Sequence, residues 1–244
     1  MVEFLMKVAG HTAKVTALFD STPFHFSRYR TEEPAEFSIT VTPEDLEFEP
    51  ADADQEAQEE GFRRREFAQP FLERAAIQRK FAEFLLYNNI VLVHGSTVAV
   101  DGRAYLFTAR SGTGKSTHTR LWREAFGDRA AMVNDDKPFL ELTETGILAH
   151  GSPWSGKHGL DTNICVPLKG ICILERGAEN RICPITAEEA MPMLLRQSHC
   201  PEGADLSRLL EMLTRQVPLW HMQCTKDISA AEIAYHAIHQ LPEC

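Results

Sequence analysis

The 244-residue chain lacks the features that mark secreted, membrane-spanning and nucleic-acid-binding proteins. It has no apolar run long enough to cross a bilayer as a helix. Residues 2–9 have neither a long apolar core nor a small-residue cleavage site, so we expect no secretory signal. The 25 Lys and Arg residues are outnumbered by 35 Asp and Glu residues, which gives a net charge of −10. Binding to a nucleic-acid backbone requires a basic face. We therefore expect a cytoplasmic protein with neither membrane nor nucleic-acid partners.

Paired cysteines are also lacking. The six cysteines form no Cys-x-x-Cys motif and show no spacing with histidine that is typical of a metal site. We expect reduced thiols, most of them buried. The sequence has no repeats, low-complexity segments or proline- and glycine-rich linkers, and its 43% hydrophobic residues can form one substantial core and a smaller lobe. The cysteines are Cys165, Cys172, Cys183, Cys200, Cys224 and Cys244.

Residues 1–88 are expected to form a small N-terminal lobe with strands and one helix, packed on the core. Alternating apolar and polar residues predict a half-buried strand over residues 37–41, and residues 15–19 are a weaker candidate. The acidic residues 44–60, followed by three arginines, favour a solvated loop or strand edge before a basic helix start over a docking tail. Helical spacing predicts a helix over residues 70–88 with its apolar stripe in the core. The stripe consists of Phe71, Ala75, Ile77, Phe81, Phe84, Leu85 and Leu86.

The most informative stretch is Ala109-Arg110-Ser111-Gly112-Thr113-Gly114-Lys115-Ser116-Thr117, which follows the apolar residues 105–108. A strand leading into such a segment is typical of a phosphate-binding loop (P-loop), whose glycines turn backbone N–H groups toward phosphate oxygens. In this pattern Lys115 adds positive charge at the outer phosphates and Ser116 offers a hydroxyl to Mg²⁺. The N-terminus of the next helix favours the same anion. The expected nucleotide-binding residues are Ser111, Gly112, Thr113, Gly114, Lys115, Ser116 and Thr117.

Ala109 takes the place of the first glycine of the usual pattern. The loop tolerates a side chain there only if the backbone angle is ordinary. After the loop, Leu121, Trp122 and Phe126 predict a helix with Gly127 as its stop signal, so strand, loop and helix follow in order. The less favoured alternative is an accidental glycine-rich turn.

The strand before the loop is predicted to end a hairpin, since Asp101-Gly102 joins residues 97–100 to residues 103–108. In ordinary doubly wound nucleotide-binding folds the corresponding strand is a buried parallel one. Residues 130–133 predict a further strand that ends at Asn134-Asp135-Asp136-Lys137. One carboxylate at this strand end would anchor nucleotide-bound Mg²⁺ and the other would act on a substrate hydroxyl. The alternative is a surface turn with a capping aspartate.

The remaining segments predict a hairpin, a loop and a largely helical C-terminal part. Residues 139–142 and 147–150 pair around a turn and lead into residues 151–159. The glycines, Trp154, lysine and histidine of that loop suit closure over a ligand. An equal alternative is a structural loop with Trp154 packed on the core. Further strands are expected at residues 171–174 and 217–224, and helices at residues 187–197, 204–216 and 229–240.

Three motifs together resemble the HPr kinase/phosphorylase family and, more distantly, the nucleotide core of phosphoenolpyruvate carboxykinases. They are His94-Gly95, the loop Ser111-Gly112-Thr113-Gly114-Lys115-Ser116, and Asp135-Asp136. The whole chain is most similar to HPr-kinase-related proteins with a serine-kinase-type C-terminal domain. The resemblance implies an α/β fold with a nucleotide-binding domain of this type over residues 89–244. It also implies an antiparallel hairpin feeding the P-loop, a small β-containing N-terminal lobe and C-terminal helices.

The same resemblance implies ATP and Mg²⁺ as cofactors and assigns roles to five residues, of which Lys115, His94, Asp135 and Asp136 are expected to be catalytic. Lys115 would contact the β and γ phosphates, and Ser116 and Asp135 would hold Mg²⁺. One of Asp135 and Asp136 would act as the base toward an acceptor hydroxyl. His94 matches a histidine that lies near the transferred phosphoryl group in that family, although a lone histidine at this place is more often a core residue.

The sequence therefore predicts a Mg-ATP-dependent kinase that acts on a hydroxyl of a small molecule or of a protein serine. The alternative is a non-catalytic ATP-binding regulatory or accessory protein, which Ala109 and the lack of a recognisable substrate motif favour. A weaker idea is a role in modifying a ribosomally made peptide, whose basic segment the acidic surface would steer. The acceptor, the choice among ATP, GTP and pyrophosphate, and a homo-oligomeric state stay open.

Overall fold

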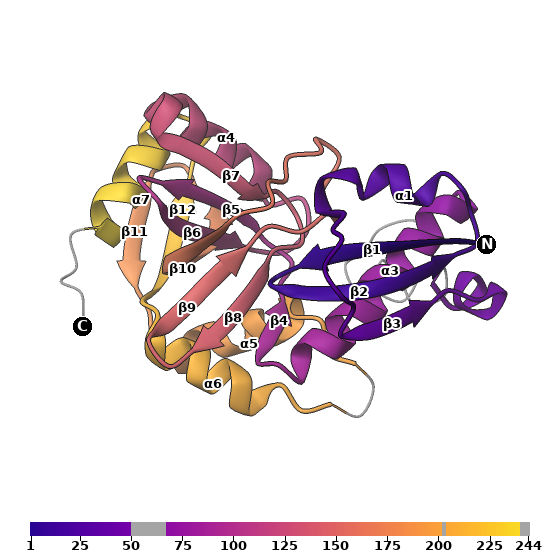
Figure 1. Cartoon of the computed structure of the whole chain (residues 1–244). Coiled ribbons are helices and arrows are strands. Elements are labelled where there is room, and N and C mark those ends of the chain that lie inside the picture. Colours follow the sequence, from indigo (N-terminus) through magenta and orange to yellow (C-terminus); the bar gives the residue numbers. More distant parts are fainter. Residues whose placement is uncertain (50–66, 202–203, 240–244) are drawn as a thin grey trace. The chain divides into compact units, whose positions relative to one another are not determined.

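The computed structural model describes residues 1–49, 67–201 and 204–239. The chain divides into two compact units, Met1–Asn88 and Asn89–Cys244, each with its own sheet and helices (Figure 1). No helix in the described ranges is long and apolar enough to cross a membrane.

The described part of the N-terminal unit contains a three-stranded sheet. Strands β1 (Val2–Val8) and β2 (His11–Ala17) form an antiparallel hairpin, and β3 (Phe37–Thr40) joins β2 in parallel. The turn residues Ala9 and Gly10 both have positive φ, 49° and 83°, as a type I′ turn requires. The strand predicted at the position of β3 is confirmed. Strand β1 is an addition, although its buried residues alternate as in any half-buried strand.

One long helix, α3 (Gln69–Leu86), contacts β2 and β3 and confirms the helix expected here. Of its predicted apolar stripe, Ile77, Phe81 and Leu85 are buried, whereas Phe71 is 46% exposed, so the prediction was wrong at that position. Residues 50–66, which include most of the acidic stretch and the three arginines, lie outside the described residues. The shorter elements of this unit are α1 (Thr22–His25), the 3-10 helix η1 (Ser27–Tyr29) and a helical stretch at residues 43–49.

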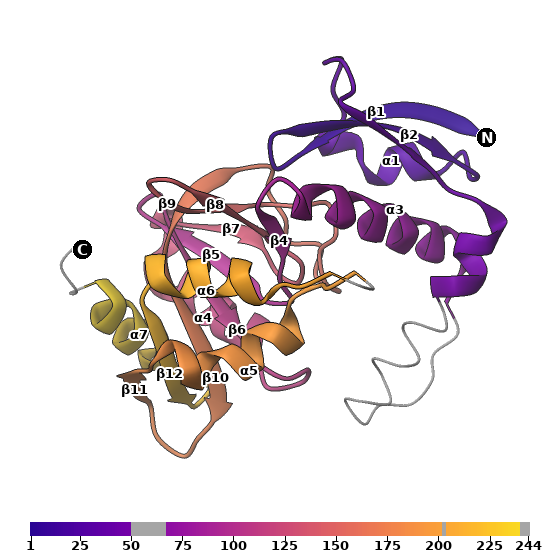
Figure 2. The same cartoon turned by 90° about the horizontal axis from the view of Figure 1, so that it is seen from below.

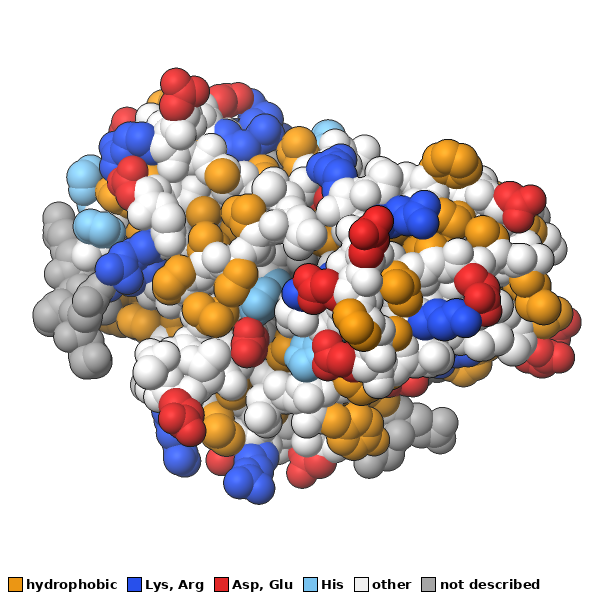
Figure 3. All heavy atoms as spheres, viewed as in Figure 1, with side chains coloured by type: hydrophobic (Ala, Val, Ile, Leu, Met, Phe, Trp, Pro, Cys, Tyr) orange, Lys and Arg blue, Asp and Glu red, His pale blue; other side chains and the backbone are white. Residues whose placement is uncertain are grey.

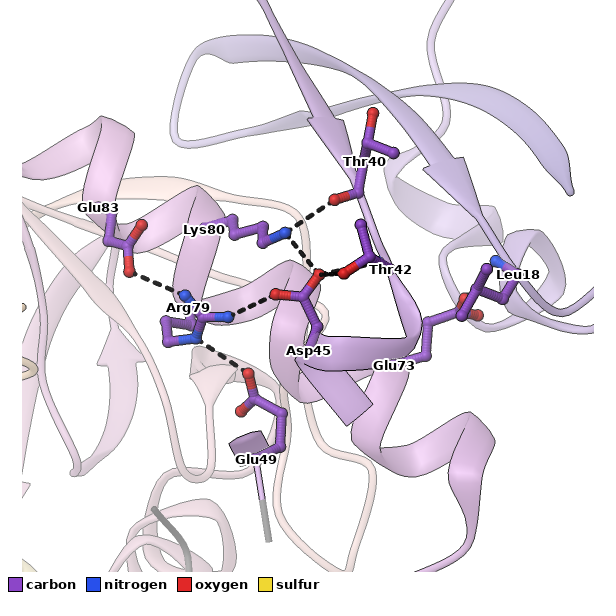
Figure 4. A network of polar contacts seen from close by, with 9 residues as sticks. All are labelled: Leu18, Thr40, Thr42, Asp45, Glu49, Glu73, Arg79, Lys80 and Glu83. Atoms are coloured by element: carbon purple, nitrogen blue, oxygen red, sulfur yellow. Dashed lines mark hydrogen bonds and ion pairs between the residues drawn. The ribbon is translucent and has the colours of Figure 1, made fainter. Parts of the chain in front are cut away.

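A set of paired charges ties α3 to the segment after β3. Arg79 bonds three carboxylates, through Nη2 to Asp45 at 2.9 Å, through Nε to Glu49 at 2.9 Å and through Nη1 to Glu83 at 3.2 Å. Lys80 Nζ donates to the second oxygen of Asp45 at 2.6 Å (Figure 4). Burial alone would raise the pKa of Asp45, but the bond from Lys80 and the nearby cations hold that pKa below its ordinary value. We call these five residues the Arg79 cluster; each of its charges has an opposite charge within the cluster.

Nine strands in the described part of the C-terminal unit form one sheet. They lie in the order β4-β8-β9-β10-β6-β5-β7, and β12 pairs with both β10 and β11. The long strand β10 pairs antiparallel with β9 through its first residues, and in parallel with β6 and β12 further along. The strands are β4 (Ile90–Leu92), β5 (Ser96–Val100), β6 (Arg103–Thr108), β7 (Ala130–Asn134), β8 (Phe139–Thr143), β9 (Gly146–His150), β10 (Cys165–Arg176), β11 (Arg181–Pro184) and β12 (Leu219–Cys224).

Strand β10 is much longer than the strand predicted at residues 171–174. Pro167 and Gly170 interrupt the apolar pattern of its first half, and both residues weaken a strand prediction. Gly170 is required by close packing, because a Cβ at this position would lie 2.8 Å from Ile238 Cγ2 of helix α7 (Ser229–His239). The register with β6 also shifts near this glycine.

Strands β5 and β6 form the predicted hairpin. Their two turn residues, Asp101 and Gly102, have positive φ of 51° and 75°. The other neighbour of β6 is the parallel strand β10. The strand that leads into the glycine loop was predicted to differ from the buried parallel strand of ordinary doubly wound folds. This is only half right, because β6 is antiparallel to β5 and parallel to β10. The second predicted hairpin, β8 with β9, is also confirmed.

The helices of the C-terminal unit follow the predicted positions. Helices α4 (Lys115–Phe126) and α7 contact each other, and Trp122 of α4 is completely buried, with its ring centroid 4.7 Å from that of Tyr105 and 5.8 Å from that of Tyr235. Figure 2 shows α5 (Ala187–Gln197) and α6 (Ser207–Gln216) next to each other. Helix α6 begins at residue 207, later than expected.

The expectation of mostly buried cysteines is wrong. Among the described cysteines only Cys172 is buried; Cys165, Cys183 and Cys200 are exposed and Cys224 is half-buried, and all five are free thiols. Two of the three exposed thiols lie on the sheet: Cys165 begins β10, and Cys183 lies on β11, which pairs with β12. Cys244 lies outside the described residues.

Acidic and basic side chains are interspersed over the face drawn in Figure 3. No broad basic patch gathers among the described residues of that face. Because the formal net charge of the chain is −10, an anionic ligand would depend on local groups rather than on a broad positive field.

Candidate functional site

Three sequence motifs meet at one end of the C-terminal sheet because of the strand order. Strand β5 lies between β6 and β7 and runs antiparallel to both, so its first residues lie beside the last residues of its neighbours. Thr97, for example, pairs with Asn134 at the end of β7. His94-Gly95 precedes β5, the glycine loop (residues 109–114) follows β6, and Asp135-Asp136 follows β7. The topology therefore brings together three motifs that are spread along the sequence from residue 94 to residue 136.

The glycine loop has the backbone conformation that its composition predicts. Gly112 and Gly114 have positive φ of 75° and 125°, which glycine adopts without strain. Ala109 is buried, and its φ is not positive. Its backbone angle is therefore the ordinary one that an alanine requires at this position. Helix α4 begins directly after the loop, at Lys115, and ends before Gly127 as predicted. The amide groups of its first turn have no partners within the helix.

The Lys115 side chain contacts the first residue of the glycine loop. Its side chain is buried, with 8% of the residue exposed, and Nζ donates a hydrogen bond to the carbonyl oxygen of Ala109 at 3.0 Å. Its positive charge also contributes to lowering the pKa values of His94 and Asp136. The loop lysine and the two other motifs therefore share one electrostatic environment.

His94 and Asp136 form a pair, with Nε2 and Oδ1 3.3 Å apart. Burial lowers the pKa of His94 below its ordinary value of 6.5, and the charges of Lys137 and Lys115 add to this against the opposing effect of Asp136. For Asp136, burial acts to raise the pKa, but the hydrogen bond with His94 and the two lysines outweigh it. The pair at neutral pH is therefore a neutral imidazole beside an ionised carboxylate.

Close packing requires a glycine at position 95, directly after His94. A Cβ at position 95 would lie 2.6 Å from Leu106 Cδ1 and 3.1 Å from the carbonyl oxygen of Phe107, so the chain passes closely over β6. The N–H of Gly95 donates to the carbonyl oxygen of Asp136 at 2.9 Å. The glycine thus lets the backbone before β5 approach both neighbouring strand ends, which holds His94 against Asp136.

Asp135 points elsewhere than Asp136. It is 3% exposed, and its Oδ1 accepts a hydrogen bond from the N–H of Gly156 at 2.7 Å, while its buried Oδ2 has no hydrogen-bond partner. Burial raises the pKa of Asp135; the Gly156 bond opposes this and the charge of Asp136 adds to it. We call Lys115, His94, Asp135 and Asp136 the site cluster.

Asn134 organises the turn that carries the two aspartates. Its completely buried side chain donates from Nδ2 to the carbonyl oxygen of Ser152 at 2.8 Å. Its Oδ1 accepts from the N–H groups of Asp136 at 2.7 Å and Lys137 at 2.6 Å. No role was predicted for Asn134, although asparagine at a strand end commonly forms a turn by bonding the amides that follow it.

The loop over residues 151–159 was predicted either to close over a ligand or to pack Trp154 on the core. Trp154 is 7% exposed and packs against Phe139, with ring centroids 6.2 Å apart, so the alternative of a tryptophan packed on the core holds. Lys157 and His158 are exposed on the same loop. Closure over a ligand stays a prediction, and Gly156, which holds Asp135, is a site residue that the sequence analysis missed.

The residues predicted to hold Mg²⁺ are hard oxygen donors, which suits this ion. Ser116 lies in the first turn of α4, and Asp135 Oδ2 is an oxygen without a hydrogen-bond partner. Within the described ranges, no group of three or more His, Cys, Asp or Glu side chains could hold a metal ion. Mg²⁺ usually keeps several waters and uses one or two carboxylates together with substrate phosphates, so the predicted donor set fits a nucleotide-bound ion rather than a resident one.

The chain matches no protein-family model, and no curated protein is significantly similar to it. Among solved structures it is similar to the Hpr(Ser) kinase/phosphatase from Coxiella burnetii, with 10% sequence identity and a TM-score of 0.35. The similarity covers 61% of this chain and 98% of that chain. At this low identity and TM-score, the function has to be argued from the geometry of the site.

Proposed function

We propose that the chain is a Mg²⁺- and ATP-dependent phosphotransferase that acts on a hydroxyl of a small molecule or of a protein serine. One observation carries the proposal: the glycine loop with its buried lysine lies at the same sheet end as a paired carboxylate and imidazole. Phosphoryl transfer needs mainly positioning and charge neutralisation, and this set of groups is sufficient for both.

The glycine loop and α4 would bind the nucleotide phosphates. The positive φ of Gly112 and Gly114 allows a loop that turns amide groups toward an anion, and the first turn of α4 adds its own free amides. Lys115 would exchange the Ala109 carbonyl for phosphate oxygens. Ser116 and an aspartate would supply oxygen ligands to Mg²⁺, which when bound neutralises phosphate charge.

Asp136 is the better candidate for the base. Its side chain is 34% exposed, its lowered pKa keeps it ionised, and it is paired with His94, whereas Asp135 is almost completely buried. Asp136 would accept the acceptor's hydroxyl proton while that oxygen bonds to the γ phosphorus and the bond from phosphorus to the leaving ADP oxygen breaks. A neutral His94 leaves the carboxylate free to take that proton.

Asp135 suits a different task. Its bond to the N–H of Gly156 ties the turn after β7 to the loop over residues 151–159. Its remaining oxygen, Oδ2, is the group available for a metal ion. The two adjacent aspartates would therefore divide the work, Asp136 at the acceptor and Asp135 at the loop and the metal.

The test is a titration of the purified chain with Mg-ATP, read as thermal stabilisation and by calorimetry. We expect binding in the wild type, and its loss in Lys115→Ala. Lys14→Ala is the matched control, because Lys14 pairs with Glu3 on the surface of the N-terminal unit. Wild-type affinity in Lys115→Ala would remove the proposal. Mg-ATP binding without ADP formation against any hydroxyl acceptor would instead favour the regulatory alternative.

A further inference from the structure

Arg176 is the last residue of β10 and lies next to the glycine loop. Strand β10 runs parallel to β6, and Ile173 pairs with Thr108, the last residue of β6. The residues of β10 that follow Ile173 therefore continue beside the loop that follows β6. In the sequence Arg176 is 63 residues from Thr113, so no local pattern reveals this contact.

The guanidinium of Arg176 bonds two successive carbonyl groups of the loop. Nε donates to the carbonyl oxygen of Thr113 at 3.3 Å, and Nη2 donates to the carbonyl oxygen of Gly112. The planar guanidinium presents its N–H groups in a fixed fork, which matches two neighbouring acceptors. A lysine ammonium has no such fork, so the contact is specific to arginine.

These bonds determine where the loop amides point. In a planar trans peptide the C=O and N–H groups point in opposite directions. Holding the Thr113 carbonyl toward Arg176 therefore turns the N–H of Gly114 away from it. The N–H of the preceding peptide, that of Thr113, donates to the carbonyl oxygen of Arg110 at 3.2 Å and closes the turn. Arg176 thus holds the loop through the carbonyl groups of Gly112 and Thr113.

We infer that Arg176 is a positioning residue for nucleotide binding: it holds the Gly112 and Thr113 carbonyls so that the loop is ordered for phosphate before the nucleotide arrives. The inference rests on the proposed function. Ordering a binding loop in advance lowers the entropy lost on binding, so the benefit appears in affinity.

The contact should contribute little to folding. Arg176 is exposed, and exposed polar contacts of this kind add little to stability. Loss of Arg176 should therefore weaken nucleotide binding and leave the melting temperature of the nucleotide-free protein unchanged. A merely structural residue would change the melting temperature as well.

The experiment compares Arg176→Ala and Arg176→Lys with the wild type and with Arg215→Ala, whose side chain is 77% exposed on α6. Three quantities are measured: amide hydrogen exchange over residues 109–117 without nucleotide, the Kd for Mg-ATP, and the melting temperature. We expect faster exchange in the loop and a Kd raised about tenfold in both Arg176 variants, in line with the loss of charge-assisted hydrogen bonds. Added guanidinium should partly restore the affinity of Arg176→Ala, and Arg215→Ala should resemble the wild type.

Two results would overturn the inference. A raised Kd with unchanged exchange in the nucleotide-free loop would mean that Arg176 binds the phosphates directly. Unchanged exchange and unchanged Kd would mean that the contact has no consequence. A wild type that binds neither Mg-ATP, Mg-GTP nor pyrophosphate would refute the proposed function, and the exchange data would still show whether Arg176 orders the loop.

Discussion

The Arg79 cluster and the site cluster are both groups of partly buried charges, but they differ in how completely their members satisfy one another. In the Arg79 cluster, one guanidinium and one ammonium bond three carboxylates with distances of 2.6–3.2 Å. In the site cluster, Asp135 Oδ2 has no hydrogen-bond partner, and the pair of His94 and Asp136 is 3.3 Å long. The first arrangement matches its charges within the fold, whereas the second contains a carboxylate oxygen that would bind the metal ion under the proposed function.

The pKa directions express the same difference. The pKa of Asp45 lies below its ordinary value because cations outweigh burial, whereas burial raises the pKa of Asp135. Charges that stabilise a native state are matched with partners, and unmatched buried charges are more frequent at functional sites. The degree of matching therefore predicts different consequences when a charge is removed from each cluster.

The largest expected effect is on turnover in Asp136→Asn. An amide cannot accept the hydroxyl proton, so turnover should fall by about 10³-fold, within the range for loss of a general base. The Kd for Mg-ATP should change by less than about fivefold, because the loop and Lys115 would make the phosphate contacts. Steady-state kinetics and calorimetry measure the two quantities. Asp45→Asn, the matched change in the Arg79 cluster, should leave turnover unchanged; a comparable loss there would mean that the clusters do not differ in function.

The next effect is on stability in Arg79→Met. The change keeps the length of the apolar stem but leaves three carboxylates with one cation among them, so the free energy of unfolding should fall by about 2–3 kcal/mol. Denaturant unfolding measures it. Arg215→Met is the control, since its pair with Glu211 is exposed and 3.9 Å long, and we expect a change within about 0.5 kcal/mol. Equal effects at the two arginines would contradict the view that the Arg79 cluster is structural.

A smaller effect is expected on the pH dependence of stability when Asp135 or Asp45 is replaced by asparagine, and the two changes should have opposite signs. The raised pKa of Asp135 means that the folded state binds the proton more tightly than the unfolded chain, so stability is lost as pH rises through the window above 3.8. The lowered pKa of Asp45 means that its contribution is present above 3.8 and is lost as pH falls through the folded-state value.

Melting temperatures of Asp135→Asn and Asp45→Asn between pH 3 and pH 7 test both signs, with shifts of a few degrees expected. Relative to the wild type, Asp135→Asn should gain stability as pH rises and Asp45→Asn should lose it. The same sign in both variants would remove the distinction between matched and unmatched carboxylates.

Local patterns were sufficient to predict the parts of the site that lie on single elements. The turn pair Asp101-Gly102 specified the hairpin, and the glycine spacing with the apolar residues of α4 specified the strand, loop and helix. The meeting of His94 with Asp136 was implied only by family resemblance, because the order of β5, β6 and β7 in the sheet is a tertiary property.

Other features depend on contacts that no local pattern contains. The adjacent aspartates have the same sequence context, so the roles proposed for them differ only because Asp135 bonds the N–H of Gly156, which is 21 residues further along the chain. The contact of Arg176 with the loop depends on the parallel pairing of β6 with β10. The exposure of Cys165 and Cys183 likewise depends on where β10 begins and on how β11 joins the sheet.

The smallest expected effect is on the pH dependence of turnover through His94. Its pKa lies below 6.5, so the imidazole is neutral at pH 7 and Asp136 is free to accept a proton. As pH falls through the pKa of His94, the imidazolium would pair with the carboxylate and turnover should decline. The midpoint of this acid limb should lie below pH 6.5 and disappear in His94→Gln, whose uncharged side chain cannot titrate. The Arg79 guanidinium remains charged over this range, so Arg79→Met should leave the midpoint in place. An acid limb that persists in His94→Gln would show that another group titrates, and that the pairing of His94 with Asp136 does not control the base.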